Sequence, residues 1–261
     1  MKVWTAAPLA ARTLIILALG VVSVTNAALG AERGSCAVPD DLLFSDSQLR
    51  RVSKAVADQH KLDIAVVGTG SSALAGPDGP RSAYPARLEA TLNLRLSGVT
   101  VKVAALLRSR LSAWDLAKGM NKLLIDEKPD LVIWQTGTID AMHRVDPESF
   151  QAALEDGISR LHKGNADVIL MNMQFSPRTE SMIAIGPYAD TMRVVSQQRG
   201  VPLFDRAGIM HHWSDTGAFD FYAAGKDNML AQRVHDCIGR AIATLIIDAG
   251  RLQAFEMKAG R

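Results

Sequence analysis

Two adjacent hydroxyls in a glycine-rich turn are the residues of this chain best suited to chemistry. The turn reads Gly68-Thr69-Gly70-Ser71-Ser72 and follows an apolar run at 64–67, IAVV, that shows no polar alternation. Such a run is typical of a central strand buried on both faces. In an open α/β sheet, ligands bind at the carboxyl ends of the strands, where the strand order reverses. We therefore expect the site beside Ser71 and Ser72, with Ser72 at the N-terminus of the following helix.

Three known motifs compete for this turn. Residues 68–73 fit G-x-G-x-x-A, the dinucleotide fingerprint, but the helix that should follow is interrupted at once by GPDGP at 76–80. The second expected strand ends in Ala104-Ala105, which offers no acid to bind a ribose. A G-x-S-x-G elbow fails because Leu74 occupies the last glycine position, and a P-loop lacks its Gly-Lys-Ser/Thr. We expect no cofactor.

A serine nucleophile needs a base, and three histidines in the C-terminal third are candidates. His211 and His212 follow the last expected strand, in a loop at the same end of the sheet as Ser72, where Asp215 could orient His212. A His-His-Trp run is, however, more often a packing feature of a loop. His235 lies about two turns into the last expected helix, too far along to reach the serine. Adjacent histidines lack the i, i+4 spacing of metal ligands on a helix, so we expect no metal.

Alternating strand and helix signals position these residues. We expect strands at 62–67, 99–104, 130–134, 167–171 and 201–204. Helices should begin at residue 84 and cover 112–124, 147–162, 187–199 and 227–248. This regular β-α alternation predicts an α/β fold in which helices cover both faces of a five-stranded parallel sheet. With right-handed crossovers, the strand order should be 2-1-3-4-5.

The first 27 residues have the features of a secretion signal. Lys2 and Arg12 precede an apolar run at 13–24, and small residues ending at Ala27 offer a cleavage site. The run is short for a membrane span, and an uncleaved anchor is the alternative. Cleavage would take the formal net charge from +2 to zero, which removes the electrostatic support for nucleic-acid binding. We expect an exported, periplasmic or secreted protein with no stable membrane span and a single domain over 28–261.

Two cysteines, Cys36 and Cys237, lie near opposite ends of the mature chain. In an oxidising compartment they favour one disulfide that joins the mature N-terminus to the last helix, and two separate buried thiols are the alternative. Closing so long a loop stabilises the folded state by about 5 kcal/mol in the chain-entropy model.

The segment 70–76, GSSALAG, resembles the first block, GDSLTAG, of the SGNH (GDSL-type) hydrolases. Five later segments fall in the order of that family's other blocks, across essentially the whole mature chain: 84–88, 112–115, 129–133, 137–140 and the region of residue 227. The resemblance implies a three-layer, flavodoxin-like α/β/α fold and hydrolysis of an ester, on lipids or acylated glycans. It also implies that Ser72 is the nucleophile, and we expect this side chain to lie exposed in the main cleft.

The sequence departs from the family pattern at three of the four catalytic positions. No glycine lies within 104–110, where the second block supplies an oxyanion donor, and Ile139 stands where the third block has asparagine. Leu230 or, in another register, Met229 occupies the position of the histidine. Losing one oxyanion donor costs about a hundred- to a thousandfold in rate. Two functions stay open: a divergent serine ester hydrolase or acyl transferase with a relocated base, and an inactive binding protein for a glycan, lipid or protein partner.

A polar loop at 172–180, after the fourth expected strand, offers replacements for the missing donors. Gln174 or Asn172 could serve the oxyanion, and Arg178 could bind an anionic group unless it pairs with Glu180. The other candidates for oxyanion or substrate contacts lie in the first and third blocks: Gly70, Ser71, Gly137, Thr138 and Asp140.

Overall fold

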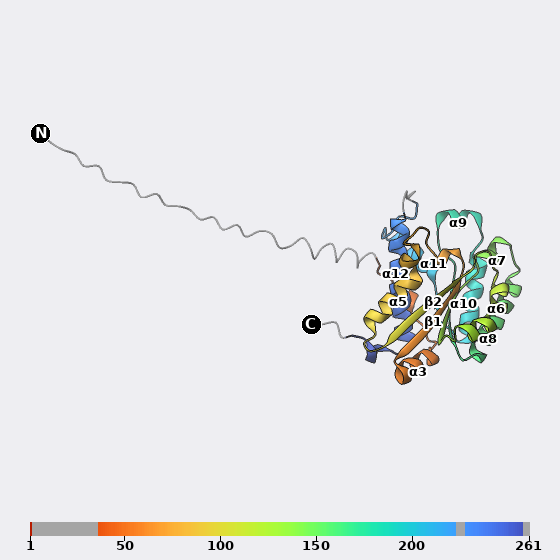
Figure 1. Ribbon diagram of the computed structural model, residues 1–261. Helices are drawn as coiled ribbons and strands as arrows, with labels where there is room; N and C mark the ends of the chain where they lie inside the picture. The colour runs from red at the N-terminus through yellow and green to blue at the C-terminus, as the bar shows by residue number, and fades with distance from the viewer. Residues whose placement is uncertain (2–35, 223–227, 258–261) are drawn as a thin grey trace. The chain divides into compact units, whose positions relative to one another are not determined.

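The computed structural model describes residue 1, residues 36–222 and residues 228–257 (Figure 1). The described residues from Cys36 onward belong to one compact unit. The expected leader lies outside the described residues apart from its first, and its cleavage therefore stays a prediction. Within the described ranges, no helix is both long and apolar enough to cross a bilayer.

Five parallel strands form one sheet: β1 (Lys61–Gly68), β2 (Thr100–Leu107), β3 (Leu131–Gln135), β4 (Asp167–Met171) and β5 (Leu203–Phe204). Their order is β2-β1-β3-β4-β5, which confirms the order predicted from the sequence. The chain leaves β1 toward β2 on one side and returns to β3 on the other. The point where strand order reverses therefore lies between the carboxyl ends of β1 and β3, next to Ser71 and Ser72.

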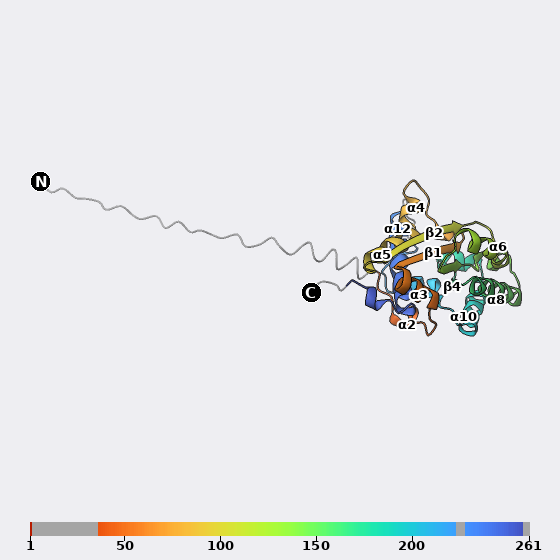
Figure 2. The same cartoon turned by 60° about the horizontal axis from the view of Figure 1, so that its bottom comes forward.

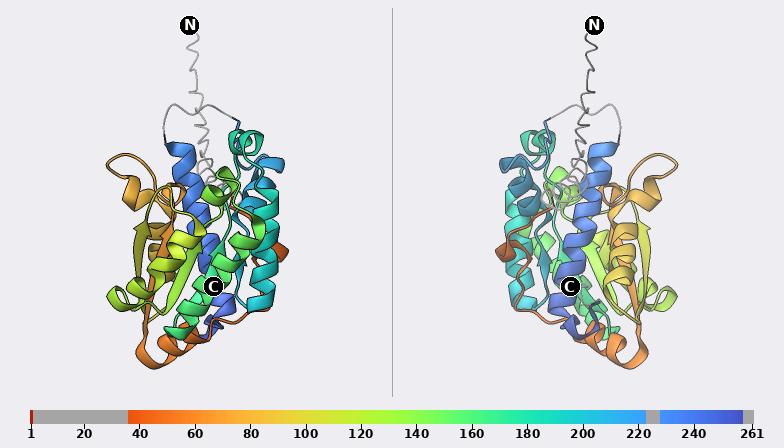
Figure 3. Two further views of the ribbon diagram at one scale, coloured as in Figure 1. Left: turned by 90° about the vertical axis from the view of Figure 1, so that its right-hand side faces the viewer. Right: turned by 90° about the vertical axis from the view of Figure 1, so that its left-hand side faces the viewer.

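Helices cover both faces of the sheet. Since successive strand residues point to opposite faces, each strand contributes side chains to two separate cores. Ile64 and Val66 face a core shared with α3, α5 and α12, and Ala65 and Val67 face a core shared with α6, α8 and α10. Figures 2 and 3 show α5 beside α12 in one layer, with α6 and α8 in the other. The six helices are α3 (Arg50–Gln59), α5 (Tyr84–Arg95), α6 (Ala113–Asp126), α8 (Pro147–Lys163), α10 (Gly186–Arg199) and α12 (Met229–Ala249). The predicted three-layer α/β/α architecture is confirmed.

The other helical elements among the described residues lie between or beyond these helices and strands. They are α2 (Asp40–Leu43), η1 (Gly70–Ser72), α4 (Gly79–Ser82), α7 (Thr138–Met142), α9 (Pro177–Met182), α11 (Arg206–Asp215) and η2 (Gln253–Phe255). The expectation that Ser72 opens a helix was wrong. Ser72 is the last residue of η1, which is one turn of 3-10 helix, and Ala73 after it is extended.

The expectation that His211 and His212 lie in a loop was also wrong, because both belong to α11. The side chain of Asp205 caps this helix by accepting a hydrogen bond from the backbone N–H of Gly208. The buried side of α11 includes Ile209, Met210 and Trp213, at helical spacing. Its packing and its cap thus stabilise a helix where the sequence suggested irregular structure.

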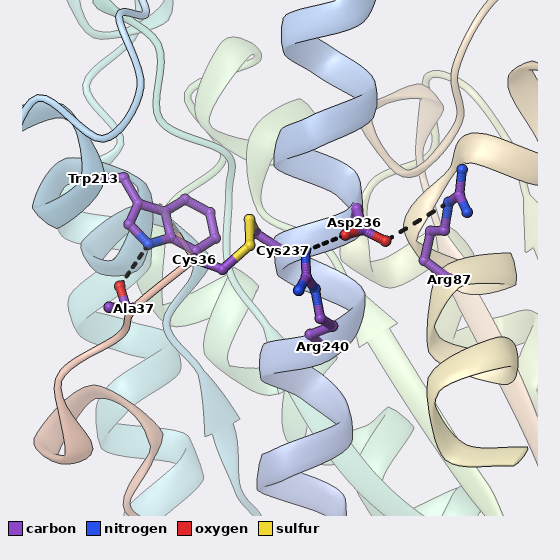
Figure 4. The surroundings of a disulfide bond; sticks show 7 residues. All are labelled: Cys36, Ala37, Arg87, Trp213, Asp236, Cys237 and Arg240. Carbon is purple, nitrogen blue, oxygen red and sulfur yellow. Dashed lines mark hydrogen bonds and ion pairs between the residues drawn. A yellow bond between two sulfur atoms is a disulfide. The ribbon is translucent and has the colours of Figure 1, made fainter. Parts of the chain in front are cut away.

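The predicted disulfide between Cys36 and Cys237 is present, with the two Cα atoms 5.1 Å apart (Figure 4). It joins the start of the described chain to α12 across a sequence separation of 201 residues. The same segment is bound to α11, since the indole N–H of Trp213 donates to the carbonyl of Ala37 at 2.9 Å. On the other side, Asp236 next to the disulfide pairs with Arg240.

Replacing both cysteines by serine should lower the free energy of unfolding by about 2 to 5 kcal/mol, because the unfolded chain regains the entropy that the long loop removes. Urea denaturation of the oxidised protein and of the double variant measures the difference. The wild-type protein in excess reductant is the matched control and should unfold like the variant. Equal denaturation midpoints for all three samples would contradict a stabilising disulfide.

Candidate functional site

Ser72 lies at the carboxyl end of β1, and contrary to expectation its side chain is buried, with 0% of the residue exposed. Gly70, which opens the turn, is exposed. The Oγ atom of Ser72 lies 3.0 Å from the phenolic oxygen of Tyr84 and 3.2 Å from Oε1 of Gln135. Gly68 leaves room for this cluster, since a Cβ atom there would lie 3.0 Å from both Ser72 Oγ and Gln135 Oε1.

Gln135, the last residue of β3, accepts three hydrogen bonds at Oε1. The donors are the backbone N–H of Thr69 at 2.9 Å, the hydroxyl of Thr69 at 3.0 Å and the hydroxyl of Ser72 at 3.2 Å. Because a backbone N–H only donates, the amide atom that faces Thr69 must be the oxygen. Ser72 therefore donates its proton to an amide oxygen. Such an oxygen orients the hydroxyl but is no base at neutral pH, so it does not activate the serine.

Tyr84, the first residue of α5, is the second partner of Ser72 and is completely buried. Burial raises the pKa of its phenol, and the hydrogen bond with Ser72 and the charge of Arg206 only partly oppose this shift. The phenol therefore stays neutral and donates to Ser72, whose own proton is directed at Gln135. The backbone N–H of Tyr84, which has no partner within its own helix, donates to Nδ1 of His235 at 3.0 Å.

His235 on α12 is 5% exposed and connects to Ser72 only through Tyr84. Burial, and secondly the positive charge of Arg206, lower the pKa of its ring to about 3. Since Nδ1 accepts a hydrogen bond, the neutral ring carries its proton on Nε2. No hydrogen bond joins His235 directly to Ser72 in the described structure. His235 therefore acts as an acceptor for the first turn of α5.

Arg206, the first residue of α11, brings two of the candidates together. Its Nη1 donates to the hydroxyl of Ser71 at 3.3 Å, and its Nη2 donates to the carbonyl of Ser71 at 3.1 Å and to Oε1 of Gln174 at 3.2 Å. The guanidinium carbon lies 5.9 Å from the centroid of the Tyr84 ring. Burial lowers the pKa of Arg206 to about 10, partly offset by Tyr84.

Among the candidates from the third block, Gly137 and Asp140 have structural roles. Gly137 has a φ of 99°, a backbone conformation that favours glycine. Asp140 is buried and accepts from the backbone N–H of Ala113 through both carboxylate oxygens, at 3.0 and 3.1 Å. Burial raises the pKa of Asp140, and the bond from Ala113 opposes that shift. This carboxylate thus helps to hold the N-terminus of α6, whereas the buried hydroxyl of Thr138 has no partner in the described structure.

The remaining candidates are not joined to the Ser72 cluster. His212 is half-buried and Asp215 exposed on α11, and within the described ranges no hydrogen bond connects either residue to Ser72 or to the other. Nε2 of His211 contacts Oε1 of Glu180 at 2.7 Å. Glu180 thus pairs with His211 and not with Arg178, which is exposed on α9.

Three residues of the cluster around Ser72 were not among the candidates predicted from the sequence: Tyr84, Gln135 and Arg206. For Gln135, a signal was available, because it is the polar residue that ends an otherwise apolar strand. For Tyr84 and Arg206 there was none, since each opens a helix and becomes part of the cluster only when that helix packs beside the turn at Ser72.

Residues 35–252 match the sequence profile of the non-GDSL lipase-like family, which is most of the chain. The chain belongs to that family. Its resemblance to the SGNH hydrolases is thereby confirmed, and the non-GDSL description of the family agrees with the altered first block. No curated protein matches the sequence.

Solved structures of lipases and esterases share the fold. A lipase/acylhydrolase from Enterococcus faecalis superposes with a TM-score of 0.56 and 16% identity, over 77% of this chain and 100% of that one. TesA gives a TM-score of 0.54 and 21% identity, over 70% and 99% of the two chains. A catalytic variant of Axe2, an acetylxylan esterase from Geobacillus stearothermophilus, gives 0.55 and 17%, over 71% and 94%. At these identities the likeness shows the α/β fold.

Substitution His235→Asn should flatten the acid side of the stability curve. Asparagine keeps an acceptor near the position of Nδ1 but does not titrate. The wild-type ring is neutral when folded and takes up a proton when unfolded, so its contribution is fully present above about pH 6.5 and is lost as pH falls toward 3. Relative to the variant, wild-type protein should lose up to about 1.4 kcal/mol per pH unit in that window.

Urea denaturation at pH 7, 6, 5 and 4 measures this difference. Substitution of an exposed histidine, His143→Asn, is the matched control and should follow the wild-type curve. Parallel curves for wild-type and His235→Asn proteins would show that His235 is not held neutral.

Proposed function

We propose that this protein is a ligand-binding member of its family that does not hydrolyse esters through Ser72. The observation that carries the proposal is the set of hydrogen-bond partners of Ser72, from which the direction of its proton follows. The hydroxyl is buried and donates to the amide oxygen of Gln135, and the phenol beside it is held neutral by burial. Neither neighbour takes a proton at neutral pH, so neither turns the hydroxyl into a nucleophile.

The distribution of histidines supports this proposal. The sequence contains six, and all of them lie within the described ranges. None of the six forms a hydrogen bond with Ser72 there. The undescribed residues between Tyr222 and Asn228 read AAGKD and include no histidine. No imidazole is therefore in place among the described residues to act as the base for Ser72. Loss of a triad base lowers the rate of a serine hydrolase by several orders of magnitude.

The altered oxyanion positions support it further. Ile139 has no side-chain donor where the family places asparagine, and no glycine stands near the end of β2. Preorganised donors contribute about 3 to 4 kcal/mol each to transition-state stabilisation, so their loss compounds that of the base.

The ligand we propose is a small acyl-bearing molecule, either an ester or its free acid, which the protein binds outside the cytoplasm. The neighbours in fold include a lipase/acylhydrolase and an acetylxylan esterase, whose names denote lipid and acylated-glycan esters. The Cys36–Cys237 disulfide fits an oxidising environment outside the cytoplasm, in agreement with the expected leader.

A fluorophosphonate probe tests the proposal on native protein. Wild-type and Ser72→Ala proteins should both remain unlabelled, and both should hydrolyse p-nitrophenyl acetate at the same background rate, because no base activates the hydroxyl. An unrelated active serine esterase serves as the positive control for the probe. Stoichiometric labelling that disappears in Ser72→Ala would overturn the proposal and establish the divergent hydrolase. The variants His212→Ala and His211→Ala would then show whether α11 supplies its base.

A further inference from the structure

Arg206 is a positive charge in the interior with no negative partner among the described residues. It is 1% exposed, and all three of its hydrogen-bond acceptors in the described structure are neutral: the hydroxyl and carbonyl of Ser71 and the amide oxygen of Gln174. Its Nε atom is buried without a partner there. An uncompensated buried charge destabilises the folded state, and its pKa, lowered to about 10, is consistent with that.

Two acids beside α11, Asp205 and Glu180, have other partners. Asp205 accepts from the side chain of Asn172 at 2.7 Å and caps α11 through Gly208. Glu180 on α9 contacts His211. The fold thus supplies two carboxylates near this helix and aims neither of them at the guanidinium.

Two of the side chains that accept from the guanidinium are accessible to solvent, although Arg206 itself is buried. Ser71 and Gln174, whose side chains each accept from one terminal nitrogen, are both partly exposed. Their bonds, at 3.3 and 3.2 Å, are longer than the roughly 2.7 to 2.9 Å of charge-assisted bonds between a cation and a carboxylate. Rotation of these two side chains frees one donor on each terminal nitrogen and leaves the bond to the carbonyl of Ser71 intact.

We propose that Arg206 is the binding site for the carboxylate of a small acidic ligand. The two carboxylate oxygens replace the hydroxyl of Ser71 and the amide oxygen of Gln174 on the fork of the guanidinium. This inference rests on the proposed binding function and narrows its ligand from an ester or an acid to the free acid.

A carboxylate fits this position better than a phosphate or sulfate. It carries one negative charge, which neutralises the single charge of Arg206, whereas a dianion would leave an excess charge in a buried position. Its planar pair of oxygens matches two terminal guanidinium nitrogens. The ring of Tyr84, 5.9 Å from the guanidinium carbon, helps to keep the fork in place.

Thermal unfolding with acetate and butyrate as probes, at constant ionic strength with chloride, tests the assignment. A bound carboxylate at ten times its dissociation constant should raise the Tm by roughly 3 °C or more, and the rise should saturate. The substitution Gln174→Glu provides a built-in carboxylate next to Arg206. It should raise the Tm without any added ligand and abolish the response to acetate and butyrate.

Two further variants complete the test. Arg206→Met removes the guanidinium and should also abolish the response, and Gln174→Glu decides the matter if Arg206→Met does not fold. Arg178→Met removes an exposed arginine of the same edge and should respond like the wild type. An unsaturable effect common to all variants, or a response to phosphate and sulfate but not to carboxylates, would overturn the assignment.

The outcome is separable from that of the proposed function. Fluorophosphonate labelling at Ser72 would refute the non-hydrolytic proposal whether or not acetate binds. An unlabelled protein that shows no Arg206-dependent response to carboxylates would refute this inference alone.

Discussion

A single amide oxygen, Oε1 of Gln135, is the constraint on which the site depends. Buried polar groups require hydrogen-bond partners, and here one acceptor serves the backbone and hydroxyl of Thr69 and the hydroxyl of Ser72. The carboxyl end of β3 thereby fixes the turn that follows β1, at the position where the strand order reverses. The same contact that holds the turn also takes the proton of the residue that resembles a nucleophile.

The consequences extend through two layers of the fold. Tyr84 joins the turn to α5 through its phenol and joins α5 to α12 through its backbone N–H and His235. Arg206 brings α11 to the other side of the same turn through Ser71. In a serine hydrolase the nucleophile gives its proton to a histidine base. Here these hydrogen bonds stabilise the packing of three helices. Nε2 of Gln135 stays buried without a partner, and the charge of Arg206 has no negative partner among the described residues.

The fold could be read from the sequence because its signals are local and redundant. Buried parallel strands are apolar runs, their helices have regular spacing, and right-handed crossovers leave few possible strand orders. Cys36 and Cys237 were assigned to a disulfide from their number and compartment alone. The helix containing His211 and His212 was missed, although its N-cap at Asp205 and the helical spacing of Ile209, Met210 and Trp213 are both local signals.

The site was less predictable because its contacts join residues far apart in the chain. Ser71 and Ser72 were found from the glycine-rich turn, but the direction of a hydroxyl proton depends on a partner 63 residues away. Likewise, Asp140 matched a family block, yet its carboxylate binds the start of α6. A motif gives the position of a side chain along the sequence, whereas its chemistry depends on which buried neighbours compete for it.

A double-mutant cycle on Ser72 and Tyr84 tests the central claim most directly, namely that the Ser72 hydroxyl is a structural hydrogen-bond partner. Unfolding free energies of the wild type, Ser72→Ala, Tyr84→Phe and the double variant give the coupling energy of the pair. The network predicts a coupling of about 0.5 to 1.5 kcal/mol, since each single variant leaves the other buried hydroxyl short of a partner. Additive effects within about 0.3 kcal/mol would contradict the account and leave the hydroxyl of Ser72 free for chemistry.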